Sequence, residues 1–126
     1  SCALAAAIYV WEREIVQPAA QRHLGAPVVR IDTYGTFACR NVYNQQSSRR
    51  SEHASANALD VAGFRLADGR RVSLVKDWTS DSQSAAFLRE VRDKSCKTFN
   101  GVLSPDYNDA HADHFHLDMG PYRICR

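Results

Sequence analysis

Four cysteines constrain the fold of this 126-residue chain most, because they are spread over its whole length and one lies near each end. They are Cys2, Cys39, Cys96 and Cys125, and no two of them form the C-x-x-C pair typical of zinc ribbons and redox motifs. An even number at this spacing predicts two disulfides that tie both ends to the body, with three pairings possible. The alternative is four buried free thiols. Since disulfides rarely persist in the cytosol, we expect a periplasmic or secreted protein.

The composition indicates one ordinary folded domain over residues 1–126. Hydrophobic residues make up 44% of the chain and charged residues 24%, and the net charge is +2. So small a positive charge predicts no nucleic-acid partner, which disfavours a metallonuclease. The uncharged apolar start, residues 2–11, is too short for a membrane span and has no basic flank like that of a signal peptide. We expect a monomer.

The hydrophobic pattern predicts an α+β domain in which helices pack on a small, mostly antiparallel sheet. Helices are expected over residues 3–16, from Pro18 to Gly25, and after a cap at Ser80 or Asp81. Strands are expected at residues 28–33, 58–66, 71–78 and 114–119, of which the middle two form a hairpin. The polar residues 40–50 are expected to form a surface loop.

Four of the five histidines fall into two groups, His53 near Asp60, and His111, His114 and His116 together. Successive side chains of a strand face opposite sides, so alternation within residues 114–119 places both histidines of His114-Phe115-His116 on one face. The same alternation places Asp60 between two alanines, which leave room above the strand. One carboxylate and neutral imidazoles suit Zn²⁺, and a catalytic zinc takes three protein ligands.

The first histidine group resembles a motif of the D-alanyl-D-alanine carboxypeptidases of the VanX and VanY type. Their motif S-x-H-x-x-G-x-A-x-D matches residues 51–60, except that Ala56 replaces the Gly. The H-x-H motif of the wider lysostaphin, carboxypeptidase and hedgehog-like (LAS) group matches His114-Phe115-His116. The resemblance implies a zinc cleft of the LAS type with His53, Asp60 and His116 as the metal ligands.

Three further stretches look like the extensin-like C-terminal domain of proteobacteria. They are Gln17-Pro18-Ala19-Ala20, Tyr34 to Arg40, and His114 to Gly120. This similarity covers nearly the whole chain. Together with the zinc motifs, it suggests that the partner is peptidoglycan and its stem peptides.

Three residues compete for the role of general base. Asp113 occupies the place where the carboxypeptidases carry a Glu, three residues before the last zinc ligand. The murein endopeptidase branch instead uses the first His of H-x-H, here His114, and another His five residues before the ligand, here His111. We favour His114 because strand alternation places it beside His116, with Asp113 second and His111 third.

Two other residues have possible roles in the site. Arg40 matches an arginine that meets a substrate carboxylate or carbonyl oxygen in many of these carboxypeptidases. Its alternative role is that of a surface arginine beside a cysteine. Asp118 could orient a ring nitrogen of His114 or His116, or could simply face solvent at the end of a strand.

The predicted function is zinc-assisted hydrolysis of an amide bond in a peptidoglycan stem peptide or crosslink. We favour D,D-endopeptidase or D,D-carboxypeptidase action, with L,D-endopeptidase action as an alternative. A second alternative is a non-catalytic, zinc-containing module of the same fold that binds the cell wall.

Overall fold

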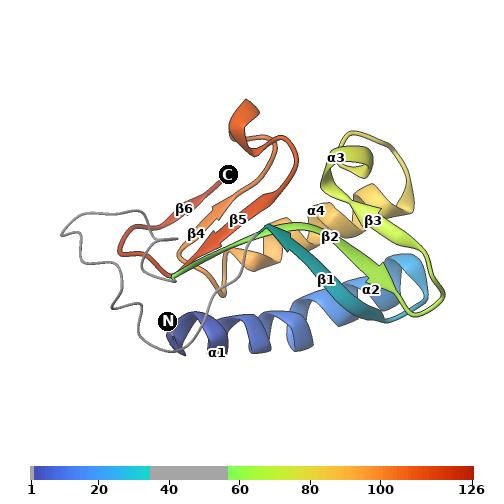
Figure 1. Ribbon diagram of the computed structural model, residues 1–126, viewed down its shortest axis with the longest axis horizontal. Helices are drawn as coiled ribbons and strands as arrows, with labels where there is room; N and C mark the ends of the chain where they lie inside the picture. Colours follow the sequence, from blue (N-terminus) through green and yellow to red (C-terminus); the bar gives the residue numbers. More distant parts are fainter. Residues whose placement is uncertain (1, 35–56) are drawn as a thin grey trace.

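The computed structural model describes residues 2–34 and 57–126. Within them the helices are α1 (Cys2–Trp11), α2 (Gln17–Leu24), α3 (Leu74–Asp77) and α4 (Gln83–Ser95). The strands are β1 (Val28–Tyr34), β2 (Ala58–Leu66), β3 (Arg71–Ser73), β4 (Gly101–Leu103), β5 (Phe115–Asp118) and β6 (Ile124–Cys125). These elements confirm the predicted α+β class (Figure 1). None of the described helices is long and apolar enough to cross a membrane.

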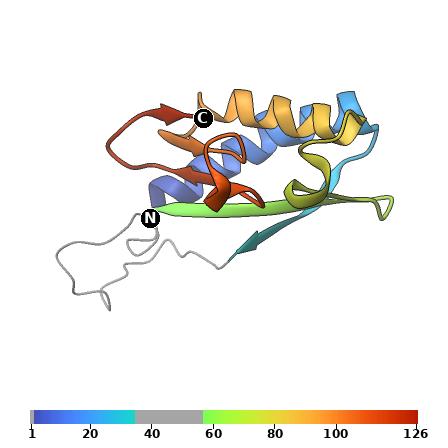
Figure 2. The same ribbon diagram turned by 90° about the horizontal axis from the view of Figure 1, so that it is seen from above.

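The strands form one mixed sheet with the order β1-β2-β5-β4-β6, and β3 pairs with the far half of β2. The pairs are antiparallel except β4 and β6, which run parallel, so the prediction of a mostly antiparallel sheet is confirmed. The helices α1, α2 and α4 lie together on one side of β2, as Figure 2 shows. The opposite face of the sheet carries none of these three helices.

The core lies between this helical layer and the sheet. Its largest fully buried side chains include Trp11 from α1, Phe87 from α4, and Phe64 and Phe115 from the inner face of the sheet. The Trp11 ring packs 6.2 Å from that of Phe64, and its Nε1 donates a hydrogen bond of 2.8 Å to Ser95 Oγ on α4. A polar indole nitrogen is thereby satisfied in the core, as burial requires.

The predicted helix over residues 3–16 is confirmed only in part, because its last turn widens into a π-helical turn, Glu12–Val16, before α2. Pro18 has no N–H to donate to the carbonyl four residues earlier, and the N–H of Gln17 reaches back five residues to Glu12 O. Gly25 ends α2 with a left-handed φ of 67°, as its place in the sequence predicted.

The second strand of the predicted hairpin, residues 71–78, is too long. β3 ends at Ser73, whose hydroxyl accepts a hydrogen bond from Lys76 N and caps the short helix α3. The cap of α4 is Ser82 rather than Ser80 or Asp81, and its hydroxyl accepts from Ala85 N. The last predicted strand is confirmed at Phe115–Asp118.

A β-bulge at Ala62 determines which side chains of β2 share a face. Adjacent residues Asp32 and Thr33 of β1 pair with Gly63 and Val61 of β2, which leaves Ala62 as the extra residue. Up to the bulge, even-numbered residues such as Asp60 face away from the helices. Beyond it the odd-numbered residues do so, because Phe64 is fully buried and Arg65 is exposed.

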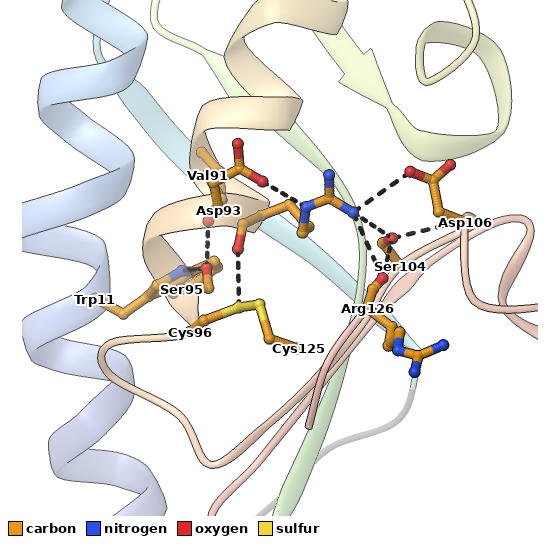
Figure 3. The surroundings of a disulfide bond; sticks show 10 residues. Trp11, Val91, Asp93, Ser95, Cys96, Ser104, Asp106, Cys125 and Arg126 are labelled. Atoms are coloured by element: carbon orange, nitrogen blue, oxygen red, sulfur yellow. Dashed lines mark hydrogen bonds and ion pairs between the residues drawn. A yellow bond between two sulfur atoms is a disulfide. The ribbon is translucent and has the colours of Figure 1, made fainter. Parts of the chain in front are cut away.

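The disulfide between Cys96 and Cys125 joins the end of α4 to β6 (Figure 3). Its Cα atoms lie 5.7 Å apart and it spans 29 residues, a loop whose closure stabilises a fold by about 3–4 kcal/mol in the chain-entropy model. None of the cysteines among the described residues is free. Cys39 and the predicted surface loop lie outside the described residues.

Candidate functional site

Asp60 and His116 form the centre of the candidate site, directly opposite each other on the antiparallel strands β2 and β5. Directly paired residues share a face, and here it is the face turned away from the helices. Asp60 Oδ1 lies 3.3 Å from His116 Nδ1, with side chains only 19% and 14% exposed. Two ligands of a tetrahedral zinc, each about 2.0–2.1 Å from the ion, are separated by about 3.3–3.4 Å. The pair therefore fits two corners of such a site.

Asp118 orients the His116 ring from the other side. Its Oδ2 lies 2.6 Å from His116 Nε2, and its Oδ1 accepts a hydrogen bond from Gly120 N at 2.9 Å. The carboxylate lies against Gly101 of β4, where a Cβ would collide with it. Burial lowers the pKa of His116, but hydrogen bonds to Asp118 and Asp60 and the charges of these carboxylates raise it to about 9. Because Asp118 holds Nε2, it is Nδ1 of His116 that faces Asp60.

His114, which precedes β5, lies between Asp113 and Asp60. Its Nδ1 is 2.8 Å from Asp113 Oδ1, and its Nε2 is 3.8 Å from Asp60 Oδ1. The hydrogen bond from His114 holds the pKa of Asp113 below its usual range, so that carboxylate is ionised at neutral pH. Nδ1 donates that hydrogen bond, and Nε2 lies on the side of the ring that faces Asp60.

Tyr34, at the end of β1, closes the site beside His114. Its hydroxyl donates to Asp113 Oδ2 over 3.4 Å, and its ring lies edge-on to the imidazole with centroids 5.8 Å apart. Burial, and then the negative charge of Asp113, raise the pKa of Tyr34. Its phenol therefore stays protonated and can donate hydrogen bonds at neutral pH.

His111 borders the site from the 3₁₀ turn Asp109–His111. Its ring centroid lies 5.0 Å from that of His114 and 6.1 Å from that of His116. Its Nδ1 is 2.7 Å from Asn108 Oδ1. Burial, followed by the positive charges of the other two histidines, lowers its pKa, so His111 is neutral at pH 7.

The comparisons with known proteins identify a family. The family model described as extensin-like protein C-terminus matches residues 1–126, which is the whole chain. The chain belongs to this extensin-like family. No curated protein and no solved structure matches the chain.

The structure of this extensin-like domain gathers several of the predicted site residues on one face of the sheet. They are Asp60, His111, Asp113, His114 and His116. The predicted ligand His53 and the predicted substrate-binding Arg40 lie outside the described residues. Within residues 2–34 and 57–126, no group of three His, Cys, Asp or Glu side chains forms a metal site.

Sequence reasoning gave Tyr34 no role in the site of this extensin-like domain. Tyr34 pairs directly with Asp60, and Asp60 pairs with His116, so three strands bring the three residues into one row. A single sequence does not state the order of strands in a sheet. The available signal was the position of Tyr34 directly after the predicted strand of residues 28–33.

Proposed function

We propose that this extensin-like domain is a zinc-dependent peptidase that hydrolyses amide bonds of peptidoglycan stem peptides or their crosslinks. D,D-endopeptidase or D,D-carboxypeptidase action is favoured, and L,D-endopeptidase action is the alternative specificity. The observation that carries the proposal is the spacing of Asp60 Oδ1 and His116 Nδ1, 3.3 Å apart, with the two histidines His111 and His114 beside them.

The donor set suits zinc. Asp60 would supply a carboxylate oxygen and His116 its Nδ1, and the third ligand implied by the family resemblance is His53. The hydrogen bond from His116 Nε2 to Asp118 is the outer-shell contact that fixes a metal-binding imidazole in one tautomer. Zinc bound here would lower the pKa of a water molecule to about 7 and polarise the scissile carbonyl.

The chain's own residues would move the proton. His114 Nε2 faces Asp60 across 3.8 Å and would accept the proton of the attacking water. Asp113 would hold the opposite nitrogen and stabilise the imidazolium that forms. This arrangement makes His114 the base and Asp113 its positioning residue, so the two candidates act together. Tyr34 could donate a hydrogen bond to the substrate at the same edge of the site.

A non-catalytic zinc-containing module that binds the cell wall is the second candidate function. The same three ligands would hold the metal in that case, but His114 would need no carboxylate partner. The 2.8 Å contact between His114 and Asp113 therefore favours the enzyme. The disulfide between Cys96 and Cys125 is compatible with the proposed periplasmic or secreted location.

Digestion of purified sacculi by the zinc-loaded protein tests the proposal. We expect new muropeptides that differ from the undigested set by the elements of water, and mass spectrometry of these products would identify the bond. The control is the same protein after removal of zinc by a chelator. Tight binding to sacculi without any new product would contradict the peptidase and favour the binding module.

Two isosteric substitutions test the assignment of the base. His114→Gln should lower turnover by about 10²–10⁴-fold while zinc stays bound, because a side-chain base contributes about that factor. Asp113→Asn should lower turnover less, since His114 would keep a basic nitrogen in a less fixed orientation. Steady-state rates and zinc content of both variants would be measured. Nearly full activity in His114→Gln, with an inactive Asp113→Asn, would make the carboxylate the base.

A further inference from the structure

The sheet face that carries the candidate site continues into a row of three arginines. Arg30 of β1 lies directly opposite Arg65 of β2, and Arg65 lies directly opposite Arg71 of β3. Residues paired in this way point to the same face of a sheet. All three residues are exposed, and the side chains of Arg30 and Arg71 are 69% and 56% accessible. We call them the arginine row.

The bulge at Ala62 places the arginine row on the same face as Asp60. Without this extra residue, Asp60 and Arg65, five positions apart, would point to opposite faces of the sheet. Beyond the bulge, Gly63 lies between Asp32 of β1 and Ser73 of β3 in the sheet and adds no side chain that would cover the surface. The site and the arginine row are therefore parts of one continuous surface, on the side without α1, α2 and α4 (Figure 2).

The row keeps a positive charge. Among the described residues one carboxylate contacts it, that of Asp32, which lies 3.3 Å from Arg30 and 3.2 Å from Arg71. No carboxylate within residues 2–34 and 57–126 forms an ion pair with Arg65. Three arginines against one aspartate leave two uncompensated charges, and like charges directly opposite each other in a sheet are destabilising. The arrangement has a cost for the fold and is suited to an anionic ligand.

The distance from the site suggests the kind of ligand. Asp60 and Arg65 are five positions apart, but the bulged residue Ala62 adds no step, so their partners on β1 are four positions apart. Four steps of about 3.3 Å give a separation of about 13 Å. An extended peptide advances by a similar length per residue. A chain that runs from the site along this surface would therefore reach the arginine row with its third or fourth residue. Arginine binds carboxylates with paired hydrogen bonds of fixed geometry.

We propose that the arginine row is a substrate subsite, which binds a carboxylate of an extended acidic peptide whose scissile bond lies at Asp60 and His116. This inference rests on the proposed function and adds the charge of the substrate and the direction in which it lies. Asp32 holds the two outer guanidinium groups in place. Arg65, between them, presents donors to the ligand.

Peptide binding tests the subsite without reference to turnover. The zinc-loaded protein is titrated with a synthetic stem pentapeptide and with the same peptide after amidation of its carboxylates. Arg65→Gln should weaken binding of the acidic peptide by about tenfold or more, because a charge-assisted hydrogen bond is lost. The same substitution should leave the affinity for the amidated peptide unchanged. The matched control is Arg13→Gln, an exposed arginine of the helical layer whose side chain contacts Tyr9. Equal affinity of wild type and Arg65→Gln for the acidic peptide would overturn the subsite.

Thermal unfolding of Arg65→Thr separates a ligand role from a structural one. Removal of the central charge should leave the melting temperature unchanged or raise it, because repulsion within the row is relieved. A lower melting temperature together with weaker binding of both peptides would make Arg65 structural and overturn the proposal. Cleavage that does not depend on Arg65 would leave the peptidase in place and remove the subsite. Binding that depends on Arg65 without any cleavage would remove the peptidase and leave the arginine row as a binding site for acidic peptides.

Discussion

Zinc binding should be lost when either Asp60 or His116 is replaced by alanine. Loss of an outer-shell partner of a metal ligand already costs about 10–100-fold in affinity, so loss of a ligand itself should cost more than about 100-fold. Metal content after dialysis and competition with a chromogenic chelator would measure the effect. By the family resemblance, His53→Ala should behave in the same way.

Two variants serve as controls for this experiment. Asp118→Asn removes the charge that orients His116 but no ligand, so its zinc affinity should fall only within that 10–100-fold range. His23→Gln alters a histidine that pairs with Glu90, away from the site, and should bind zinc like wild type. Stoichiometric zinc in His116→Ala, or its loss in His114→Ala, would show that the ligand assignment is wrong.

The stability of the metal-free protein should fall as the pH rises from about 6.5 to about 9. The pKa of His116 is raised from 6.5 to about 9 in the fold, so its protonated form stabilises the native state fully below pH 6.5. This contribution is lost as the pH rises through the folded pKa. A shift of this size corresponds to about 3 kcal/mol. Urea unfolding in the presence of a chelator, at several pH values, would measure it.

Zinc should cancel this pH dependence, because zinc-bound His116 is neutral, as it is in the unfolded chain above pH 6.5. The metal requires a neutral His116, so binding displaces a proton, and the apparent affinity should rise about tenfold per pH unit as the pH approaches 9. The stabilisation that zinc adds grows with that affinity. His116→Gln serves as the control. It should remove the contribution of His116 to the pH dependence of stability, both with the chelator and with zinc. A metal-free stability that rises between pH 6.5 and 9, relative to His116→Gln, would contradict a protonated His116.

Alternation and periodicity predicted the parts of the fold that depend on one element alone. His116 and Asp118 share one face of β5 while Phe115 and Leu117 are fully buried on the other, as strict alternation requires. The error at residues 71–78 has a local cause. Leu74 and Val75 continue an apolar run that is typical of a strand, but Ser73 caps a helical turn there, and Val75 is 71% exposed.

The sequence predicted the hairpin that pairs β2 with β3, but the pairing of strands that are distant along the chain was beyond its reach. Tyr34 joins the site because β1 lies beside β2, and Arg65 joins the same face because one residue of β2 bulges. Both facts depend on contacts between segments that are distant along the chain. The two motifs named Asp60 and His116 as candidate ligands without knowledge of these contacts, because the resemblance rests on residue types and spacing alone.

The bulge at Ala62 makes the length of β2 as important as its composition. Loss of one residue there would leave the hydrophobic content nearly unchanged, yet the two halves of the strand could no longer both present their polar side chains to solvent. Either Asp60 or Arg65 would turn toward the core, where a buried charge without a partner costs about 3–5 kcal/mol of stability. Either Val61 or Phe64, both fully buried, would turn outward in exchange. An extensin-like relative that lacks this residue must therefore give up the outward-facing carboxylate of Asp60, the central arginine, or the present core.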